Sequence, residues 1–264
     1  MLVILKRDNQ EVNEQAAQLI AGAIRKNPSL TLGLATGSTM VGLYRHLVRL
    51  HQAGSLDFSQ AATFNLDEYL GLPASHPQSF NHFMHEHFFR HINIQPRNIH
   101  IPDGSVRRDY DAYCASYEQS IRAAGGIDLQ ILGIGRNGHI GFNEPTSSLA
   151  SRTRLKVLSR ETIDDNAKFF GPREESPRCA ITMGIGTILE ARKILLLATG
   201  PPKAAAVAKS IEGPITCAVS ASALQLHPDV TFLLDEPAAA QLTQREYYQR
   251  VLEMTALLTP DRLS

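Results

Sequence analysis

The sequence predicts an α/β protein with one open, mostly parallel sheet and helices on both of its faces. Three observations support this fold class. Short apolar, β-prone runs alternate with longer amphipathic segments along the chain. The runs are almost continuously apolar, which is typical of parallel strands that are covered on both sides. No internal repeat or low-complexity tract interrupts the alternation, so we expect a single domain over residues 1–264.

The first half of the chain contains three expected strands and four expected helices. Each strand is a short apolar run, and the helices carry apolar residues three or four positions apart, such as Leu43, Leu47 and Leu50. In chain order, the segments are strand Leu2–Leu5, helix Asn13–Arg25, strand Leu30–Ala35, helix Val41–His51, strand Ala62–Asn65, helix Ser79–His91 and helix Asp109–Ala124.

The second half begins with the apolar run Ile127–Gly133 and then departs from the alternation. Residues 147–178 are rich in charged side chains and poor in aliphatic ones. Such a segment is either a solvated excursion or a lid-like insert over a site in the sheet, and we expect a lid. The remaining segments are strand Ile194–Ala198, helix Lys203–Ile211, strand Ile215–Ser220, strand Val230–Leu234 and helix Pro237–Leu258.

The composition excludes several classes of protein. Lys and Arg number 26, Asp and Glu also number 26, and the net charge of zero gives no sign of a nucleic-acid-binding surface. No apolar run approaches the length of a membrane span, and the apolar stretch at the start is too short for a signal peptide. The three cysteines form no CxxC motif, which favours a reducing, cytoplasmic location.

Ligands of open parallel sheets bind beyond the carboxyl ends of the strands, so the residues after each strand are the first candidates. Gly37, Ser38 and Thr39 follow the second expected strand and open a helix, where free amides and hydroxyls suit a phosphate. The alternative is an ordinary helix cap at Ser38 or Thr39. Lys203 follows the strand Ile194–Ala198 and is a candidate cation for the same anion.

Two adjacent carboxyl groups, those of Asp67 and Glu68, follow the strand Ala62–Asn65. Neighbouring residues on an extended strand point in opposite directions, so we expect only one of them to face a ligand. A partly desolvated carboxylate at this position could act as a general base. The alternative is a solvated or helix-capping pair.

The segment from Gly133 to Pro145 carries the strongest functional signal. Glycines at 133, 135, 138 and 141 indicate tight turns and close approach of a ligand to the backbone. His139 and Glu144 lie in this loop, where the carboxylate could fix the tautomer of an imidazole that moves a proton near neutral pH. His87 and His91 have a spacing that suits a metal, but no third ligand is evident, and we expect no metal site.

Together these segments resemble the glucosamine/galactosamine-6-phosphate isomerase family, in particular its glucosamine-6-phosphate deaminases. The resemblance extends along nearly the whole chain. It is carried by LATGST (34–39), TFNLDEYLGL (63–72), ILGIGRNGHIGFNEP (131–145), SSLASRTR (147–154) and LQLHPDV (224–230). It implies conversion of glucosamine 6-phosphate and water to fructose 6-phosphate and ammonia, without a cofactor.

The resemblance also implies roles for individual residues. Asp67 matches the base that moves a proton from C2 to C1, and His139 matches the residue that opens the sugar ring. Glu144 and Asn137 match its supporting residues. The residues that match phosphate ligands are Gly37, Ser38, Thr39, Lys203 and Lys168.

Two of these positions depart from the pattern of the family. Asn137 stands where some members have Asp, and Lys168 stands where an Arg is expected. The second change replaces a guanidinium, which can bind a phosphate through two parallel hydrogen bonds, by a compact ammonium group. Some hexameric members are activated by N-acetylglucosamine 6-phosphate. Ser147, Arg154 and Lys156 match the residues of that allosteric site, but the next position is valine rather than a hydroxyl residue. The resemblance leaves open whether the chain forms a homo-oligomer.

Two other readings compete with the deaminase. One is a lactonase that acts on 6-phosphogluconolactone, against which TFNLDEY and the Phe142–Pro145 tail argue. The other is a sugar-phosphate sensor without catalysis. Such sensors normally carry a DNA-binding helix-turn-helix module, and the first expected strand begins too early to leave room for one.

Overall fold

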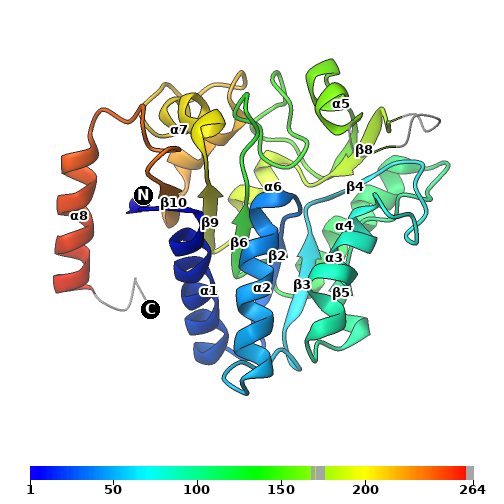
Figure 1. Cartoon of the computed structure of the whole chain (residues 1–264). Helices are drawn as coiled ribbons and strands as arrows, with labels where there is room; N and C mark the ends of the chain where they lie inside the picture. Colours follow the sequence, from blue (N-terminus) through cyan, green and yellow to red (C-terminus); the bar gives the residue numbers. More distant parts are fainter. Residues whose placement is uncertain (168–169, 171–175, 260–264) are drawn as a thin grey trace.

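The computed structural model describes residues 1–167, 170 and 176–259 of the chain. Its main sheet has seven strands, all parallel, in the order β1-β10-β9-β6-β2-β3-β5. Helices surround this sheet (Figure 1), which confirms the predicted α/β class. The strands are β1 (Leu2–Lys6), β2 (Thr31–Leu34), β3 (Ala62–Asn65), β5 (Ile99–His100), β6 (Leu129–Leu132), β9 (Lys193–Ala198) and β10 (Val230–Asp235).

Except for the last one, the expected helices begin and end within a few residues of where their apolar periodicity predicts. In α1 (Asn9–Lys26), the Asp8 carboxylate caps the first turn by accepting a hydrogen bond from the Glu11 amide. α1 lies beside α2 (Ser38–Gln52), as Figure 1 shows. The others are α3 (Phe80–His87), α4 (Tyr110–Ala123), α7 (Ala204–Ile211) and α8 (Arg245–Leu258), with 3-10 turns η1 (Phe89–His91), η2 (Pro96–Asn98), η3 (Pro201–Lys203) and η4 (Ser220–Leu226).

A second, antiparallel sheet has the order β4-β8-β7 and was not predicted. Its strands are β4 (Asp67–Tyr69), β8 (Cys179–Thr182) and β7 (Arg154–Val157), each too short for a recognisable alternation. The charged segment expected as an insert supplies β7 and α5 (Arg160–Ala167). After β8 the chain forms the short helix α6 (Ile185–Leu189). Asp67 therefore belongs to the small sheet, two residues beyond the end of β3 in the main one.

Two expected elements are wrong. Residues 215–220 form no strand, because the chain turns back on itself: Thr216 and Val219 make an isolated antiparallel bridge, and η4 follows at once. β10 pairs directly with β9, so the parallel sheet has no place for a strand between them. The last helix begins only at Arg245: residues 236–241 form turns instead, and the Glu212 carboxylate accepts hydrogen bonds from the amides of Thr243 and Gln244 just before the helix.

The order of strands fixes where a ligand can bind. β2 and β6 are neighbours, but the chain proceeds from β2 toward β3 and β5 on one side and from β6 toward β9 and β10 on the other. The loops that follow these two strands therefore diverge at the carboxyl ends, which is where open α/β sheets bind their ligands. These loops are residues 35–37 and 133–145, both of which the sequence singled out.

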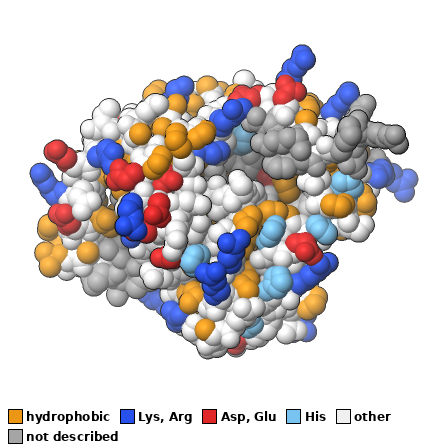
Figure 2. Space-filling model, in the orientation of Figure 1, with side chains coloured by type: hydrophobic (Ala, Val, Ile, Leu, Met, Phe, Trp, Pro, Cys, Tyr) orange, Lys and Arg blue, Asp and Glu red, His pale blue; other side chains and the backbone are white. Residues whose placement is uncertain are grey.

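The surface carries charges of both signs. On the face shown in Figure 2, acidic and basic side chains are interspersed. No helix in the described part of the chain is long and apolar enough to cross a membrane.

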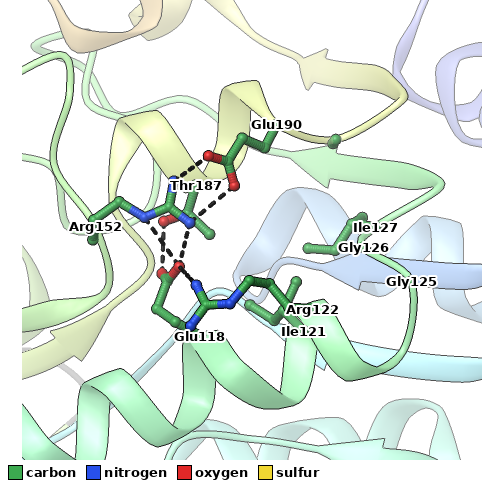
Figure 3. Close-up of a pocket in the computed structure, with 10 residues that line it drawn as sticks. Glu118, Ile121, Arg122, Gly125, Gly126, Ile127, Arg152, Thr187 and Glu190 are labelled. Atoms are coloured by element: carbon green, nitrogen blue, oxygen red, sulfur yellow. Dashed lines mark hydrogen bonds and ion pairs between the residues drawn. The ribbon is translucent and has the colours of Figure 1, made fainter.

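A buried ion cluster anchors the start of the charged segment (Figure 3). Glu118 of α4 is only 5% exposed and accepts hydrogen bonds from the Thr153 amide at 2.9 Å and the Thr187 hydroxyl at 2.7 Å. The Arg152 guanidinium bridges Glu118 and the exposed Glu190. Although burial opposes ionisation, these hydrogen bonds hold the pKa of Glu118 below its usual value. The Glu118 carboxylate thus holds the residues just before β7 against helices α4 and α6.

We expect Glu118→Gln to destabilise the protein by about 2–3 kcal/mol at pH 7, because an amide cannot satisfy several donors that a buried carboxylate accepts. Glu190→Gln is the matched control: it changes the outer partner of the same arginine, which is 65% exposed, and should cost less than about 1 kcal/mol. Denaturant unfolding measures both. Equal losses would show that Glu118 does not anchor the segment.

Candidate active site

The loop after β2 presents an uncapped helix start. Gly37 is the residue before α2, with φ of 107°, a conformation that favours glycine. No side chain caps the first turn of α2, and Ser38 is exposed, which excludes the alternative of an ordinary cap at Ser38 or Thr39. The amides and hydroxyls of the first turn therefore remain available to an anion, which the helix dipole favours at this end.

Lys203 links the turn after β9 to the glycine-rich loop. It ends η3 beyond β9, and its Nζ donates a hydrogen bond to the Ile134 carbonyl at 2.6 Å. Met40, in the first turn of α2, contacts Gly133: its Cε lies 3.4 Å from where a Cβ on Gly133 would stand. The loops after β2 and β6 and the turn after β9 thus meet, as the strand order requires.

The glycine-rich loop folds back over its own beginning. The Gly135 amide donates to the His139 carbonyl at 2.8 Å, and Gly138 has φ of 87°. The imidazole of His139 packs on Gly135, where any Cβ would lie 2.4 Å from the ring. Glycine at 135 is therefore a condition for this position of the imidazole.

His139 and Glu144 form the expected pair. Nδ1 of His139 lies 3.5 Å from Oε2 of Glu144. Asn137 contacts both residues: its side-chain oxygen accepts from the His139 amide at 3.1 Å, and its Nδ2 lies 3.4 Å from Oε2 of Glu144. Burial opposes ionisation of Glu144, but the neighbouring His139 and the Thr162 hydroxyl outweigh it and lower its pKa to about 2. Glu144 is thus a fixed negative charge behind the imidazole.

Asp67 lies against the same loop, and its pKa is shifted in the direction opposite to that of Glu144. Its Oδ2 is 3.4 Å from where a Cβ on Gly141 would stand, and the residue is only 6% exposed. Burial and the adjacent charge of Glu68 raise the pKa of Asp67 to about 8. Glu68 is used structurally: its carboxylate accepts hydrogen bonds from the Phe80 and Asn81 amides at the start of α3. Only one of the two carboxyl groups faces the loop, as the alternation of a strand predicts.

The residues matched to an allosteric site contain two unpartnered polar groups. Ser147 is 2% exposed, and neither its hydroxyl nor Nη2 of Arg154 has a hydrogen-bond partner among the described residues. Lys156 follows Arg154 two positions along β7 and shares its face of the strand. Lys168, matched to the substrate phosphate, lies outside the described residues.

Sequence reasoning missed the residues that support Glu144. Thr162 of α5 donates to Oε1 of Glu144, and the Ser159 amide lies 3.4 Å from the same oxygen. Ser159 also caps α5 by accepting from the Thr162 amide at 3.2 Å. A serine before a helix is a local signal for the cap, but nothing local shows that this helix start lies against Glu144.

Comparison with known proteins agrees with this geometry. The profile of the family described as glucosamine-6-phosphate isomerases/6-phosphogluconolactonase matches residues 7–228. A glucosamine-6-phosphate deaminase of Shewanella loihica is 52% identical over 98% of this chain and 96% of its own, and one of Cellvibrio japonicus is 53% identical over 95% of both. The chain belongs to this family.

Two solved structures separate the branches of the family. A monomeric glucosamine-6-phosphate deaminase superposes with a TM-score of 0.88 at 46% identity, covering 91% of this chain and all of that one. A 6-phosphogluconolactonase of Trypanosoma brucei has a TM-score of 0.72 at 21% identity, covering 92% of this chain and 98% of that one. The second likeness concerns the fold alone.

The raised pKa of Asp67 predicts a pH dependence of stability. Between about pH 4 and 8, folded Asp67 keeps a proton that the unfolded chain has released, so rising pH destabilises the wild type through this group. Asparagine does not titrate. The unfolding free energy of Asp67→Asn relative to wild type should therefore increase over this range, by at most about 1.4 kcal/mol per pH unit, and level off above pH 8.

Unfolding by urea at a series of pH values measures this difference. The control is Asp57→Asn, at an exposed carboxylate whose pKa is lowered by the Ser59 amide and by Asn93. Asp57 is ionised in both the folded and the unfolded protein above pH 5. The unfolding free energy of Asp57→Asn relative to wild type should therefore stay constant between pH 5 and 8. A flat difference for Asp67→Asn as well would contradict a raised pKa.

Proposed function

We propose that the protein is a glucosamine-6-phosphate deaminase, an enzyme that converts glucosamine 6-phosphate and water to fructose 6-phosphate and ammonia. One observation carries this proposal: a buried carboxyl group of raised pKa, that of Asp67, lies against the loop that holds the His139–Glu144 pair. The relatives named glucosamine-6-phosphate deaminase, at about half identity over nearly the whole chain, support the same activity. The lactonase alternative has weaker support: the family description includes 6-phosphogluconolactonase, but the lactonase structure that we compare is only about one fifth identical.

The phosphate of the substrate binds at the crevice between β2 and β6. The amides of Gly37, Ser38 and Thr39 at the start of α2 donate hydrogen bonds to the phosphate oxygens, and Lys203 supplies a positive charge nearby. Lys168 is proposed as a further phosphate ligand. Fixing this end of the sugar places its other end over the glycine-rich loop, which lowers the entropy cost of reaching the reactive geometry.

The ring of the sugar opens first. His139 takes the proton of the C1 hydroxyl and returns it to the ring oxygen, which converts the hemiacetal to the aldehyde. Glu144 is ionised and lies behind the imidazole, so it orients His139 and stabilises its protonated form. Asn137 holds the backbone of His139 and cannot carry a proton itself.

Asp67 then carries out the isomerisation. Its carboxylate removes the proton from C2 while the 2-ammonium group of the substrate gives up the proton that the C1 oxygen gains, which yields an enolamine, and the protonated Asp67 then delivers its proton to C1. The product carries an imine at C2. Water adds to this carbon, the resulting carbinolamine expels ammonia, and the ketone of fructose 6-phosphate remains. A pKa of about 8 suits a group that must both accept and return a proton near neutral pH.

Further properties follow from this activity. We propose that the chain acts as one domain whose segment 147–178 closes over the bound sugar, since Thr162 of α5 already contacts Glu144. Ser147, Arg154 and Lys156 are proposed to bind a second sugar phosphate, and the unpartnered buried groups of Ser147 and Arg154 support this. A cytoplasmic location fits the free cysteines and a phosphorylated substrate.

The oligomeric state is the remaining proposal. A homo-oligomer is proposed from the resemblance to hexameric members, whereas the deaminase of the structural comparison is described as monomeric. Sedimentation velocity of the purified protein, with and without N-acetylglucosamine 6-phosphate, decides between the two states.

The direct test is to incubate the purified protein with glucosamine 6-phosphate and no added cofactor. We expect ammonia and fructose 6-phosphate in equal amounts. Asp67→Asn should bind the substrate but form neither product and exchange no C2 proton with solvent. Folded wild-type protein that forms neither product contradicts the proposal, and a lactonase assay on 6-phosphogluconolactone is then the next measurement. Wild-type exchange in Asp67→Asn would remove this residue from the role of base.

His139→Gln should impair turnover of the closed-ring sugar most, by about 10²-fold or more, because it removes the acid–base group of ring opening. An open-chain substrate analogue should be affected much less. Comparing kcat on the two substrates measures the difference. An equal loss on both would show that His139 acts after the ring has opened.

A further inference from the structure

Thr182 occupies the centre of the small sheet. It is fully buried in β8, and its cross-strand partners are Asp67 on β4 and Arg154 on β7. Directly opposed residues of antiparallel strands project from the same face of a sheet. Thr182 therefore stands next to the proposed base, on the face from which Asp67 meets the glycine-rich loop.

The hydroxyl of Thr182 ties this sheet to the glycine-rich loop. It accepts a hydrogen bond from the Phe142 amide at 3.1 Å. Phe142 lies between His139 and Glu144 in the chain, so the bond holds the loop between the two members of that pair. A second tie follows one residue later, where Nδ2 of Asn143 donates to the Met183 carbonyl at 2.9 Å.

The same hydroxyl and the proposed base converge on Gly141. A Cβ on Gly141 would lie 3.0 Å from Oγ1 of Thr182 and 3.4 Å from Oδ2 of Asp67. Both oxygens thus pack over the Cα atom of Gly141, a residue that has no side chain and whose φ is 55°. Thr182 thus meets both sides of this point: its hydroxyl bonds to the loop at the Phe142 amide, and its backbone is the cross-strand partner of Asp67.

We propose that Thr182 is a positioning residue of the reaction: its hydroxyl holds Asp67 and the His139–Glu144 loop at the separation that proton transfer requires. This inference rests on the proposed function. Proton transfers need the reacting groups within hydrogen-bond reach of the substrate, and a misplacement of about 1 Å can cost on the order of 10²-fold in rate.

The residue type tests the role of the hydroxyl. Thr182→Val keeps the shape but leaves the buried Phe142 amide without an acceptor, whereas Thr182→Ser keeps the acceptor and loses only a methyl group. Thr63→Val is the matched control: Thr63 is also a fully buried strand threonine, but its hydroxyl has no partner in the described part of the chain.

The experiment measures kcat and KM for glucosamine 6-phosphate, and the exchange of the C2 proton, in the wild type and the three variants. We expect Thr182→Val to lower kcat and the exchange rate by about 10- to 100-fold. KM should change less than about threefold, because the phosphate ligands lie at the start of α2 and at Lys203. Thr182→Ser should stay within about threefold of the wild-type kcat, and Thr63→Val should match the wild type.

Several results would overturn the role of Thr182: wild-type kcat in Thr182→Val, an equal loss in Thr182→Ser, or a rise of KM in proportion to the loss of kcat. Circular dichroism and thermal unfolding confirm that each variant is folded. If Thr182→Val does not fold, Thr182→Cys takes its place, since a thiol fills similar space and is a weak acceptor, and the same outcomes apply. Absence of ammonia from the wild type would contradict the proposed function itself, whereas an active wild type with an equally active Thr182→Val contradicts only the positioning role.

Discussion

The contact of the glycine-rich loop with the small sheet is the constraint on which the site depends. The loop leaves β6 at the point where the chain directions of β2 and β6 diverge, so it is free to turn across the carboxyl edge of the sheet. It stays there because the Phe142 amide and the Asn143 side chain bond to β8 and its end. These bonds bring His139, Glu144 and Asp67, from two separate parts of the chain, to one place.

The two carboxyl groups at this place have opposite properties because their surroundings differ. Glu144 is surrounded by donors, which hold its pKa at about 2. Asp67 is buried beside another acidic residue, which raises its pKa to about 8. One group is thus a permanent charge and the other a proton carrier, a division that arises when a fold places chemically similar groups in unlike environments. Glycines are needed at both positions, since a side chain at 135 would occupy the space of the His139 ring and one at 141 would crowd the Thr182 hydroxyl.

The same fold serves different chemistries within the family. The lactonase structure shares the sheet and its connections but only about one fifth of the sequence, so the fold alone does not identify the reaction. The difference must lie in side chains at the edge of the sheet. Here the proposed base, Asp67, stands on a strand of the small sheet, and the buried Glu118 anchors the segment that leads into that sheet. The small sheet therefore links the chemistry to the charged segment.

The sequence by itself determined the alternation of the main sheet, because apolar runs and helical periodicity are local properties, and it singled out the loops at 37–39 and 133–145 through their glycines. It did not predict the short strands β4, β7 and β8, because such strands are defined by their partners, and β4 and β8 lie more than a hundred residues apart. It also predicted a strand at residues 215–220, because the apolar character of these residues does not show the turn that they form. Only the tertiary structure decided which of Asp67 and Glu68 faces the loop, that Thr162 donates to Glu144, and that the Thr182 hydroxyl accepts from the Phe142 amide of the loop. Burial, hydrogen bonding and pKa depend on neighbours that are distant in the chain, so no local pattern could specify them.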